Sequence, residues 1–301
     1  MERIEDMKKS AYISVITAAF LWGILGIFVK HLTASGFTSL QITFIRAGGA
    51  SVLLLIYLLY KDRSLLRIEP SDVKYFVGTG ICSFAFFNWC YFMAIQYTSL
   101  SVAAILLYTA PAIVSVLSVI LFQEAFTQKK QISLLLTFIG CVLVTGYLQG
   151  YDQKISFIGL MTGLGAGLGY ALYSIFGKIA LKKYDSLTVT AYTFILASIG
   201  LLPIAQVKEM FMGFADAETI GYAVALSFFG TVLPFLFYTK GLSSLESSKA
   251  SIIATLEPVV ATIVSIFVFA ERISITKFMG ILLVIAAIII IREKKDISEV
   301  S

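Results

Sequence analysis

Residues 101–124 read SVAAILLYTAPAIVSVLSVILFQE, and residues 248–271 read SKASIIATLEPVVATIVSIFVFAE. A shift of 147 positions aligns the two segments without a gap. The identical pairs are Ser101 with Ser248, Ala103 with Ala250, Ile105 with Ile252, Pro111 with Pro258, Ser118 with Ser265, Phe122 with Phe269 and Glu124 with Glu271. Seven matches in 24 positions exceed what shared apolar composition alone produces. Internal duplication of this kind predicts the architecture of the whole chain.

The register extends upstream of these two segments. Tyr91 pairs with Tyr238 at the same shift. With one residue of slip, three further pairs align: Trp22 with Tyr170, Phe28 with Phe176, and Lys30 with Lys178. The chain is therefore interpreted as two copies of one unit, residues 1–148 and residues 149–301.

The composition indicates a membrane protein. Apolar residues make up 58% of the 301 residues and charged residues only 14%, whereas soluble domains carry about 25% charge. A helix that crosses a bilayer needs about 20 mainly apolar residues. Ten stretches meet this requirement, five in each copy: 12–31, 39–60, 73–95, 101–122, 131–148, 157–179, 187–206, 218–240, 248–269 and 273–291. The predicted fold is an all-α membrane protein with ten transmembrane helices.

The distribution of Lys and Arg predicts the orientation, because these residues stay preferentially on the cytoplasmic side. With the N-terminus inside, 17 of them fall on the cytoplasmic side, five on the outer side, and Arg46 within a span. Both termini are therefore predicted to be cytoplasmic, in a multi-pass protein of the cytoplasmic (inner) membrane. This bias accounts for the net charge of +5, so no nucleic-acid partner is expected. The first span is predicted to be retained, because its removal as a signal peptide would break the repeat.

An odd number of spans in each copy has a geometric consequence. The second copy must enter the membrane from the side on which the first copy left it, so the two five-helix repeats are inverted. Inverted repeats are typical of secondary transporters, in which two halves rock about a site near the middle of the membrane. Glu124 would then end the fourth span on the inside, and Glu271 would end the ninth span on the outside.

The order of sequence features resembles the EamA family of the drug/metabolite transporter superfamily. The residues that carry the resemblance are Trp22-Gly23, Ile45-Arg46-Ala47, Thr109-Ala110-Pro111 followed by Glu124, and Leu256-Glu257-Pro258-Val259 followed by Glu271-Arg272 and Gly280. The resemblance covers about residues 12–147 and 157–292. It implies a ten-span fold that carries small metabolites, often amino acids or related compounds and frequently outward, without implying one substrate.

Glu257 is the leading candidate for a functional side chain, because ionisable residues are costly within a membrane. It lies nine residues into the ninth expected span, or about 14 Å at 1.5 Å per residue. Burial disfavours its charged form, so Glu257 is expected to exchange a proton or to pair with a substrate ammonium. The structural alternative is a protonated Glu257 bonded to a backbone carbonyl that Pro258 leaves free.

Arg46 lies only seven residues into the second expected span. The favoured interpretation is structural, with the long side chain snorkelling to the outer interface. The functional interpretation is a bidentate clamp for a substrate carboxylate. Together, Arg46 and Glu257 would suit a zwitterion, which favours an amino acid as substrate.

Aromatic and amide side chains within the spans are candidates for the walls of the binding site. Those retained as substrate-binding candidates are Trp22, Asn88, Trp89, Tyr91, Tyr108, Tyr170, Tyr173 and Tyr238. Aromatic faces attract cations, so a quaternary amine or another cationic compound is an alternative substrate. Packing is the alternative role for each of these rings taken singly. Trp22, Tyr91, Tyr170 and Tyr238 stand out because they occupy matched positions in the two copies.

Charged residues at the ends of spans are candidates for gating the pathway: Lys30, Lys178, Glu124 and Glu271. The alternative for Lys30 and Lys178 is that they only anchor helix ends. The three cysteines lie within spans at no metal-ligand spacing, so no metal site and no cofactor are expected. The oligomeric state is left open.

Three classes of function remain in comparison. A secondary transporter that works by alternating access fits the inverted duplication, and without an ATP-binding motif it must use a gradient, with a proton as a candidate coupling ion. A non-transporting membrane receptor or scaffold is the alternative. An enzyme is not expected, because no nucleophile and base share a depth. The predicted partners are therefore a small-molecule substrate and the lipid bilayer.

Overall fold

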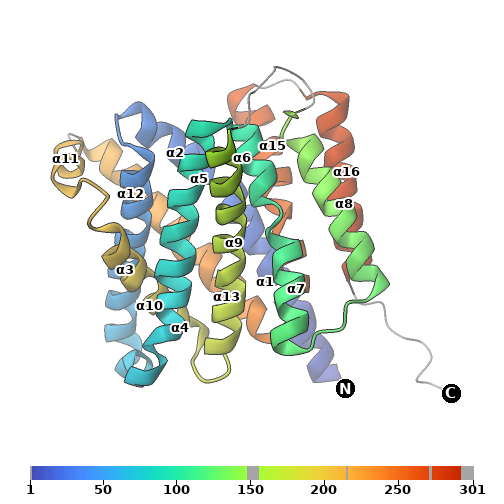
Figure 1. Cartoon of the computed structure of the whole chain (residues 1–301). Coiled ribbons are helices and arrows are strands. Elements are labelled where there is room, and N and C mark those ends of the chain that lie inside the picture. Colours follow the sequence, from blue (N-terminus) through green and yellow to red (C-terminus); the bar gives the residue numbers. More distant parts are fainter. Residues whose placement is uncertain (1, 148–155, 215, 271–272, 293–301) are drawn as a thin grey trace.

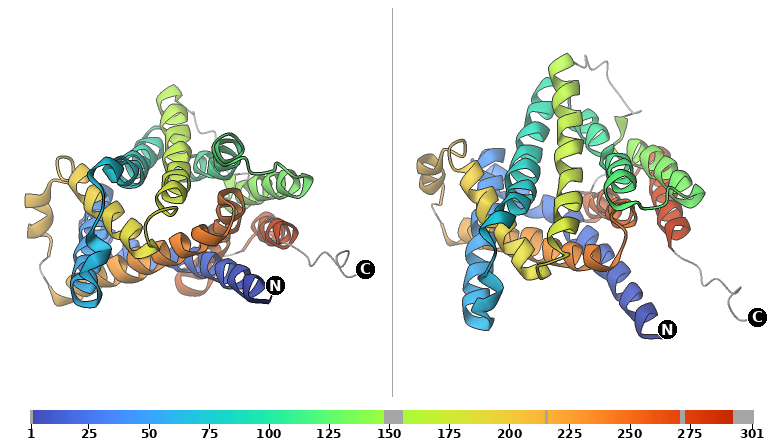
Figure 2. Two further views of the ribbon diagram at one scale, coloured as in Figure 1. Left: turned by 90° about the horizontal axis from the view of Figure 1, so that it is seen from below. Right: turned by 60° about the horizontal axis from the view of Figure 1, so that its bottom comes forward.

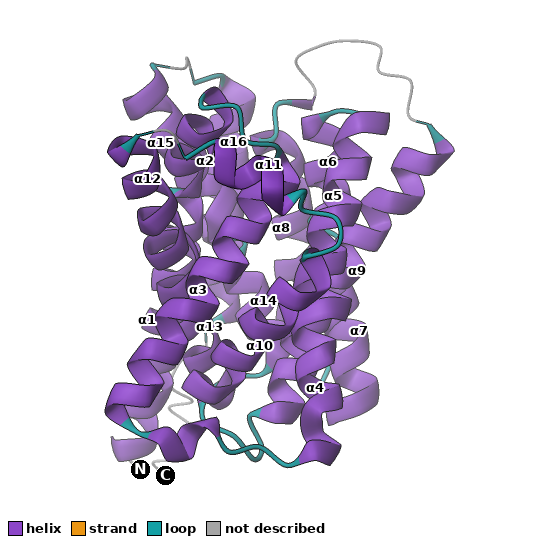
Figure 3. Cartoon of the chain, turned by 90° about the vertical axis from the view of Figure 1, so that its left-hand side faces the viewer, coloured by secondary structure: helices purple, strands orange, loops and turns teal. Residues whose placement is uncertain are grey.

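A computed structural model of the chain describes residues 2–147, 156–214, 216–270 and 273–292. All regular elements in these ranges are helical, which confirms the prediction of an all-α protein (Figures 1 and 3). The elements are α1 (Glu2–Gly23), α2 (Leu25–Ala34), α3 (Ser39–Lys61), η1 (Arg63–Leu66), η2 (Pro70–Asp72), α4 (Val73–Val77), η3 (Gly78–Ala85), α5 (Phe86–Tyr97), α6 (Leu100–Leu107), α7 (Ala110–Phe122), α8 (Gln128–Val144), α9 (Phe157–Ala180), α10 (Ser186–Leu201), α11 (Val207–Met212), α12 (Ala217–Ser227), η5 (Phe228–Val232), α13 (Leu233–Ser244), α14 (Ser247–Ala254), α15 (Leu256–Phe269) and α16 (Ile275–Ile291).

Several of these helices are long and apolar enough to cross a membrane. Seven stretches within the described residues qualify by length and hydropathy: 6–34, 39–61, 70–97, 100–122, 157–180, 217–244 and 247–269. Helices α10 and α16 are apolar but shorter, and α8 has 17 residues. The chain is therefore a multi-pass membrane protein, and the ten-span prediction is met for these seven stretches.

Helix boundaries in the first part of the chain recur 147 positions later. Thr38 caps the start of α3, and Asp185 caps the start of α10, each accepting a hydrogen bond from a backbone N–H of the first turn. Gln123 ends α7 and Ala270 ends α15, and both adopt the left-handed conformation, with φ of 56° and 53°. Helices α8 and α16 begin and end at the same shift. The weak sequence echo thus extends to the local structure.

Five of the expected spans contain interruptions that the hydropathy pattern did not reveal. The expected span 12–31 is divided into α1 and α2 at Ile24. The fourth stretch is divided at Tyr108 and Thr109, and the ninth at Thr255. In the fourth and ninth stretches a proline follows within three residues of the break, Pro111 and Pro258 respectively. Proline interrupts a helix because it lacks a backbone donor and crowds the preceding turn. Two π-helical segments, η3 and η5, interrupt the third and eighth stretches, and such segments are frequent at functional sites.

Helices α8 and α16 pack against each other at one side of the molecule (Figure 2). Their contact is close because glycines face each other: a Cβ atom on Gly140 would lie 2.9 Å from the carbonyl oxygen of Gly280, and one on Gly280 would lie 2.7 Å from that of Gly140. Ser133 adds a hydrogen bond of 3.1 Å from its hydroxyl to the carbonyl of Ala287. Small residues that let backbones approach are the usual basis of helix association in lipid.

Replacing Gly140 with alanine is expected to lower the free energy of unfolding by about 1 to 3 kcal/mol, because the methyl group would force two backbones apart. The matched control is Gly221→Ala, since no atom lies within 4 Å of a Cβ atom built there. Thermal unfolding of the two purified variants in detergent measures the difference. Equal melting temperatures would contradict the assignment of a close α8–α16 contact.

We call the end of the molecule where α1 begins, drawn at the bottom of Figure 1, the lower end. Ion pairs and a hydrogen bond connect two loop segments there. Lys183 forms ion pairs with Asp72, at 2.7 Å between Nζ and Oδ2, and with Glu69. Tyr184 donates a hydrogen bond of 2.6 Å to the same Asp72 carboxylate. The hydrogen bonds that Lys183 makes to Asp72 and Glu69 raise the pKa of Lys183 above its usual range. These contacts fix the start of α4 against the connection between α9 and α10.

Candidate functional site

A cavity of about 500 Å³ lies between the helices. Its deeper wall includes Trp22, Tyr173 and Tyr238, and its outer wall includes Ser39 at the start of α3 and Phe269 at the end of α15. The start of α3 and the end of α15 lie toward the upper end of the molecule in Figure 1, opposite the lower end. The cavity therefore extends from the middle of the bundle toward the upper end, and its volume suits a small metabolite.

Glu257 lines this cavity from the second position of α15. It follows the break at Thr255 and precedes Pro258. Gly23 of α1 packs directly behind it, because a Cβ atom there would lie 3.0 Å from the carbonyl oxygen of Glu257 and 2.5 Å from Cβ of Val260. Only a glycine lets α1 approach this closely. Within the described part of the chain, no hydrogen bond reaches the Glu257 carboxyl, which leaves it available to a ligand.

Arg46 lines the same cavity from α3. Its Nε donates a hydrogen bond of 3.3 Å to the hydroxyl of Thr231 in η5, and its guanidinium lies 5.5 Å from the ring centre of Phe84. These contacts hold the side chain inside the bundle. The favoured expectation that Arg46 snorkels to the outer interface is therefore wrong, because both partners of the guanidinium face the interior.

The two opposite charges share one cavity without neutralising each other directly. No ion pair within 4.0 Å joins Arg46 to Glu257 among the residues that the structure describes, and Arg46 instead bonds Thr231. A carboxyl group and a guanidinium group thus remain separate on the wall of one cavity. A zwitterion could meet both, its carboxylate at Arg46 and its ammonium at Glu257.

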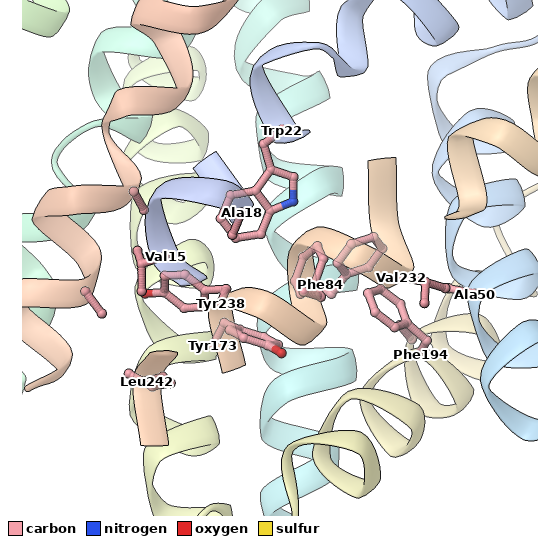
Figure 4. Close-up of a cluster of buried hydrophobic side chains, with 14 of the residues drawn as sticks. Val15, Ala18, Trp22, Ala50, Phe84, Tyr173, Phe194, Val232, Tyr238 and Leu242 are labelled. Atoms are coloured by element: carbon pink, nitrogen blue, oxygen red, sulfur yellow. The ribbon is translucent and has the colours of Figure 1, made fainter. Parts of the chain in front are cut away.

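Several aromatic rings that line the cavity pack against one another, and we call this cluster the aromatic floor; Figure 4 labels its members Trp22, Tyr173 and Tyr238. The indole of Trp22 lies 5.1 Å from the ring of Phe235 and 5.4 Å from that of Tyr238, measured between ring centres. Tyr173 contacts the same Phe235 at 5.1 Å with its ring nearly perpendicular. Edge-to-face pairs of this kind are favourable beyond the area they bury. The rings come from α1, α9 and α13 and bring parts of the two sequence copies into one cluster.

The remaining aromatic and amide candidates separate into two groups. Asn88, Tyr91, Tyr108 and Tyr170 line the cavity. Trp89 does not, since it is 41% exposed on the outside of the bundle, so its assignment to the substrate site is wrong. Consecutive residues of a helix point about 100° apart, and Asn88, which is buried and donates 2.8 Å to the carbonyl of Phe84, takes the inward direction.

Hydrogen bonds join α9 to α13 beneath the aromatic floor. The hydroxyl of Tyr173 lies 2.6 Å from that of Thr239, and the hydroxyl of Ser174 lies 2.7 Å from that of Tyr238. One turn further down, Lys178 donates 2.7 Å bonds to two carbonyl oxygens at the end of α13, those of Leu242 and Leu245. These bonds join α9 to α13. They match the alternative role foreseen for Lys178, that of an anchor for a helix end.

An ionic cluster lies nearer the lower end, with the side chains of Glu124 and Lys130 buried and that of Glu246 40% exposed. Glu124, at the end of α7, accepts hydrogen bonds from the backbone N–H groups of Ser247 at 2.7 Å and Ser248 at 3.3 Å, and from the Ser248 hydroxyl. Lys130 lies 3.3 Å from the Glu124 carboxylate and 2.7 Å from that of Glu246. Glu124 thus caps the start of α14, where a negative charge is stabilised by the helix dipole.

Lys130 is a residue that sequence reasoning missed. It counted only as one of the cytoplasmic charges, yet it is 2% exposed. The available signal was its position, six residues after Glu124 and within the first turn of the next helix. At the other end of the molecule, Lys30 lies 3.8 Å above the ring of Phe269, which lines the cavity. Glu271, the fourth gating candidate, lies outside the described residues.

No group of three or more His, Cys, Asp or Glu side chains comes together in the part of the chain that the structure covers. The prediction that the cysteines play no ligand role stays a prediction. Cys90 and Cys141 are buried, and Cys82 is exposed.

Comparison with known proteins identifies the family to which the chain belongs. The family model described as "EamA-like transporter family" matches residues 9–146 and 157–292. The chain belongs to the EamA-like transporter family. The family resemblance seen in the sequence is thereby confirmed, and the chain is a membrane transporter.

Relatives of this EamA-like transporter carry matching names. A protein of Archaeoglobus fulgidus called "Uncharacterized transporter" is 30% identical and aligned over 92% of this chain and 94% of its own. The "Uncharacterized transporter YyaM" of Bacillus subtilis is 27% identical over 81% of each chain. The "Uncharacterized inner membrane transporter YicL" of Salmonella typhimurium is 22% identical over 94% of this chain and 95% of its own.

A solved crystal structure also superposes on the chain. Its TM-score is 0.76, with 16% identity and coverage of 94% of this chain and 97% of that one. At this identity the likeness concerns the fold alone.

Proposed function

We propose that the chain is a secondary transporter that exports a small polar metabolite, an amino acid or a related amine, by alternating access. The observation that carries the proposal is the cavity of about 500 Å³, which holds Arg46 and Glu257 unpaired and is bounded by aromatic rings. Arg46 would bind the substrate carboxylate and Glu257 its ammonium group. Trp22, Tyr91 and Tyr108 would enclose the apolar part of the substrate.

The architecture that we propose is a ten-helix bundle of two inverted repeats, residues 1–148 and 149–301. The repetition of helix boundaries at a shift of 147 supports it. Helix directions support it as well, since α1 runs upward and α9 downward in Figure 1, while α7 runs downward and α15 upward. Helices α8, α10 and α16 would complete the set, with tilts smaller than those of longer helices. In such transporters the site lies between the repeats.

We propose that the lower end of the molecule faces the cytoplasm of a cell bounded by an inner membrane, with both termini inside. The connections between α3 and α4 and between α9 and α10 lie at that end in Figure 1. They contain Arg63, Arg67, Lys182 and Lys183, in agreement with the preference of positive charge for the cytoplasm. The cavity would then lead outward, and the seal of Lys130, Glu124 and the Tyr173–Thr239 pair would close the cytoplasmic side.

The orientation is tested by cysteine labelling. After Cys82, Cys90 and Cys141 are replaced with alanine, Ser35→Cys and Ser243→Cys place single thiols at exposed positions near opposite ends of the molecule. A membrane-impermeant maleimide should label Ser35→Cys on intact cells, and should label Ser243→Cys only after the membrane is permeabilised. The reverse pattern would contradict the proposed orientation.

The substrate is tested in two steps. A panel of amino acids, primary amines and quaternary amines is first screened for compounds that raise the melting temperature of the purified protein, because a ligand that binds only the folded state raises its stability. Compounds that bind are then assayed for counterflow in proteoliposomes. Stabilisation by quaternary amines alone would favour a carrier of cations held by the aromatic rings. Binding without flux under any gradient would favour a receptor and overturn the proposal.

The same vesicles test the coupling ion. If a proton drives the exchange, an imposed pH gradient should accelerate counterflow of the stabilising compound. Glu257 is the proposed carrier of that proton, because its carboxyl lies in the cavity without a hydrogen-bond partner among the described residues.

A further inference from the structure

We infer that the end of α5 is a binding site for the ammonium group of Lys30, and that Lys30 occupies it when the cavity closes toward the upper end. The site is the counterpart of the one that Lys178 occupies at the end of α13 in this structure. The inference rests on the proposed transport by alternating access, and it names two lysines that would control access to the cavity from opposite ends.

The occupied site lies at the end of α13. Lys178 is partly buried, and its Nζ donates hydrogen bonds of 2.7 Å to the carbonyl oxygens of Leu242 and Leu245 and one of 3.4 Å to that of Ser243. The last carbonyl groups of a helix have no partner within the helix, and a cation beside them also interacts favourably with the helix dipole. These bonds therefore hold α9 against the end of α13.

Helix α5 ends in the same way as α13. The two helices have 12 residues each, and their bounds differ by the repeat shift of 147. The backbone N–H of Thr98 donates a hydrogen bond of 2.9 Å to the carbonyl of Ala94, and that of Leu245 donates one of 3.0 Å to the carbonyl of Gly241, at the same shift. The end of α5 thus presents the same arrangement of backbone carbonyls that α13 presents to Lys178.

The carbonyl groups at the end of α5 are available for a donor. The counterparts of the acceptors Leu242 and Leu245 are Ile95 and Thr98. Neither the Ile95 nor the Thr98 carbonyl oxygen accepts a hydrogen bond within the described part of the chain. A matching set of acceptors is therefore used in the second repeat and unused in the first.

The corresponding lysine is held elsewhere. Lys30 aligns with Lys178 at a shift of 148. It is exposed, and its Nζ lies 3.8 Å from the ring centre of Phe269, at the end of α15. Because the face of an aromatic ring attracts a cation, this contact keeps the ammonium group of Lys30 at α15. Phe269 lines the cavity, so Lys30 lies beside the cavity wall.

The cavity is bordered by the two elements that Lys30 would join. Residues of both helices line it: Gly26 and Val29 of α2, and Tyr91 and Phe92 of α5. Helix α2 and the end of α5 lie toward the upper end in Figure 1. Transfer of Lys30 from Phe269 to the end of α5 would draw these walls together and close the cavity at that end. In inverted repeats that exchange conformations, Lys178 would leave the end of α13 in the same step.

The test follows access to the cavity in the full-length protein and needs no substrate. With the three natural cysteines replaced by alanine, Ala261→Cys places one thiol in the cavity wall, and we call this protein the parent. A membrane-impermeant thiol reagent is applied on the side of the membrane that the upper end faces. Lys178→Met should slow labelling at least about fivefold, because it removes hydrogen bonds to a charged group from the state that is open at the upper end.

The decisive measurement is made on a double variant. Lys30→Met should label at least as fast as the parent, because it weakens only the state that is closed at the upper end. Combined with Lys178→Met it weakens both states, so labelling should return to within about twofold of the parent. The matched control is Lys208→Met, an exposed lysine of α11 near the upper end, which should leave labelling unchanged and should not restore it in Lys178→Met.

The melting temperature in detergent separates an effect on access from a loss of folding. If Lys178→Met does not fold, Lys178→Gln takes its place, because glutamine keeps an N–H donor. Its labelling should fall in the same direction by a smaller factor, and Lys30→Met should again restore it.

Two results would overturn the inference. Labelling of the folded Lys178 variant at the rate of the parent would show that Lys178 does not control access. A double variant that labels as slowly as the Lys178 variant alone would show that Lys30 has no binding site at the end of α5. Failure of the transport proposal looks different, since labelling would shift as expected while no compound moved in proteoliposomes.

Discussion

Replacing Lys130 with methionine is expected to lower the free energy of unfolding by about 3 to 5 kcal/mol, because it leaves a buried carboxylate without its counter-charge. The ammonium group contacts Glu124 at 3.3 Å and Glu246 at 2.7 Å, and Lys130 is 2% exposed. Methionine retains most of the aliphatic length, so the change is mainly one of charge. Denaturation of purified protein by titration with SDS measures the loss.

The neighbouring residue offers a matched control. Lys129 is exposed, and Lys129→Met should change stability by less than about 0.5 kcal/mol. The double variant Lys130→Met with Glu124→Gln should recover part of the loss, because the carboxylate that was left unpaired is then neutral. A Lys130→Met protein as stable as Lys129→Met would contradict the role of this cluster in sealing the lower end.

Replacing Glu257 with glutamine is expected to reduce counterflow of the stabilising metabolite at least about 30-fold while the protein remains folded. The substitution keeps the shape of the side chain and removes the charge that would pair with a substrate ammonium, an interaction worth about 2 to 5 kcal/mol when it is buried. Initial rates in proteoliposomes give the size of the effect, and the melting temperature reports folding. Proton-coupled flux should also disappear in Glu257→Gln, because the variant lacks the carboxyl group that would carry the proton.

Glu218 provides the comparison for Glu257. It is an exposed residue near the start of α12, so Glu218→Gln should transport normally. If flux by Glu257→Gln kept the same dependence on pH as flux by the natural protein, Glu257 would have no part in proton transfer. If flux itself were unchanged, the substrate would not contact Glu257.

The two predictions address opposite ends of one mechanism. Glu257 lies in the cavity that we propose to face outward, whereas Lys130 belongs to the seal that would have to open before the cavity could face the cytoplasm. Alternating access requires that a cluster such as Glu124, Lys130 and Glu246 be broken and reformed in each cycle. A buried ion pair suits this role, because an intact pair contributes little net stability. Removing one partner by mutation, in contrast, is strongly destabilising, since it leaves an uncompensated buried charge.

The candidate site was largely predictable from residues that are costly in lipid. Glu257 and Arg46 were identified because a charge within a span requires a partner or a cavity, and both line one cavity. The matched aromatic residues Trp22, Tyr91, Tyr170 and Tyr238 line it as well. The direction of Arg46 was not predictable, since a long side chain near a span end can reach either the interface or the interior. Its hydrogen bond to Thr231, 185 residues away in the chain, decides between them.

The sequence by itself determined that the chain is a helical membrane protein with a duplicated plan, because run length, composition and an internal shift of 147 are properties of the chain alone. Which apolar face of each helix meets lipid and which meets the cavity was decided only by the tertiary structure. Lipid tails are as apolar as leucine, so hydrophobic periodicity does not distinguish the two faces. The outward position of Trp89 and the inward position of Lys130 both depend on which face of a helix turns inward. Contacts between helices far apart in the sequence decide that direction.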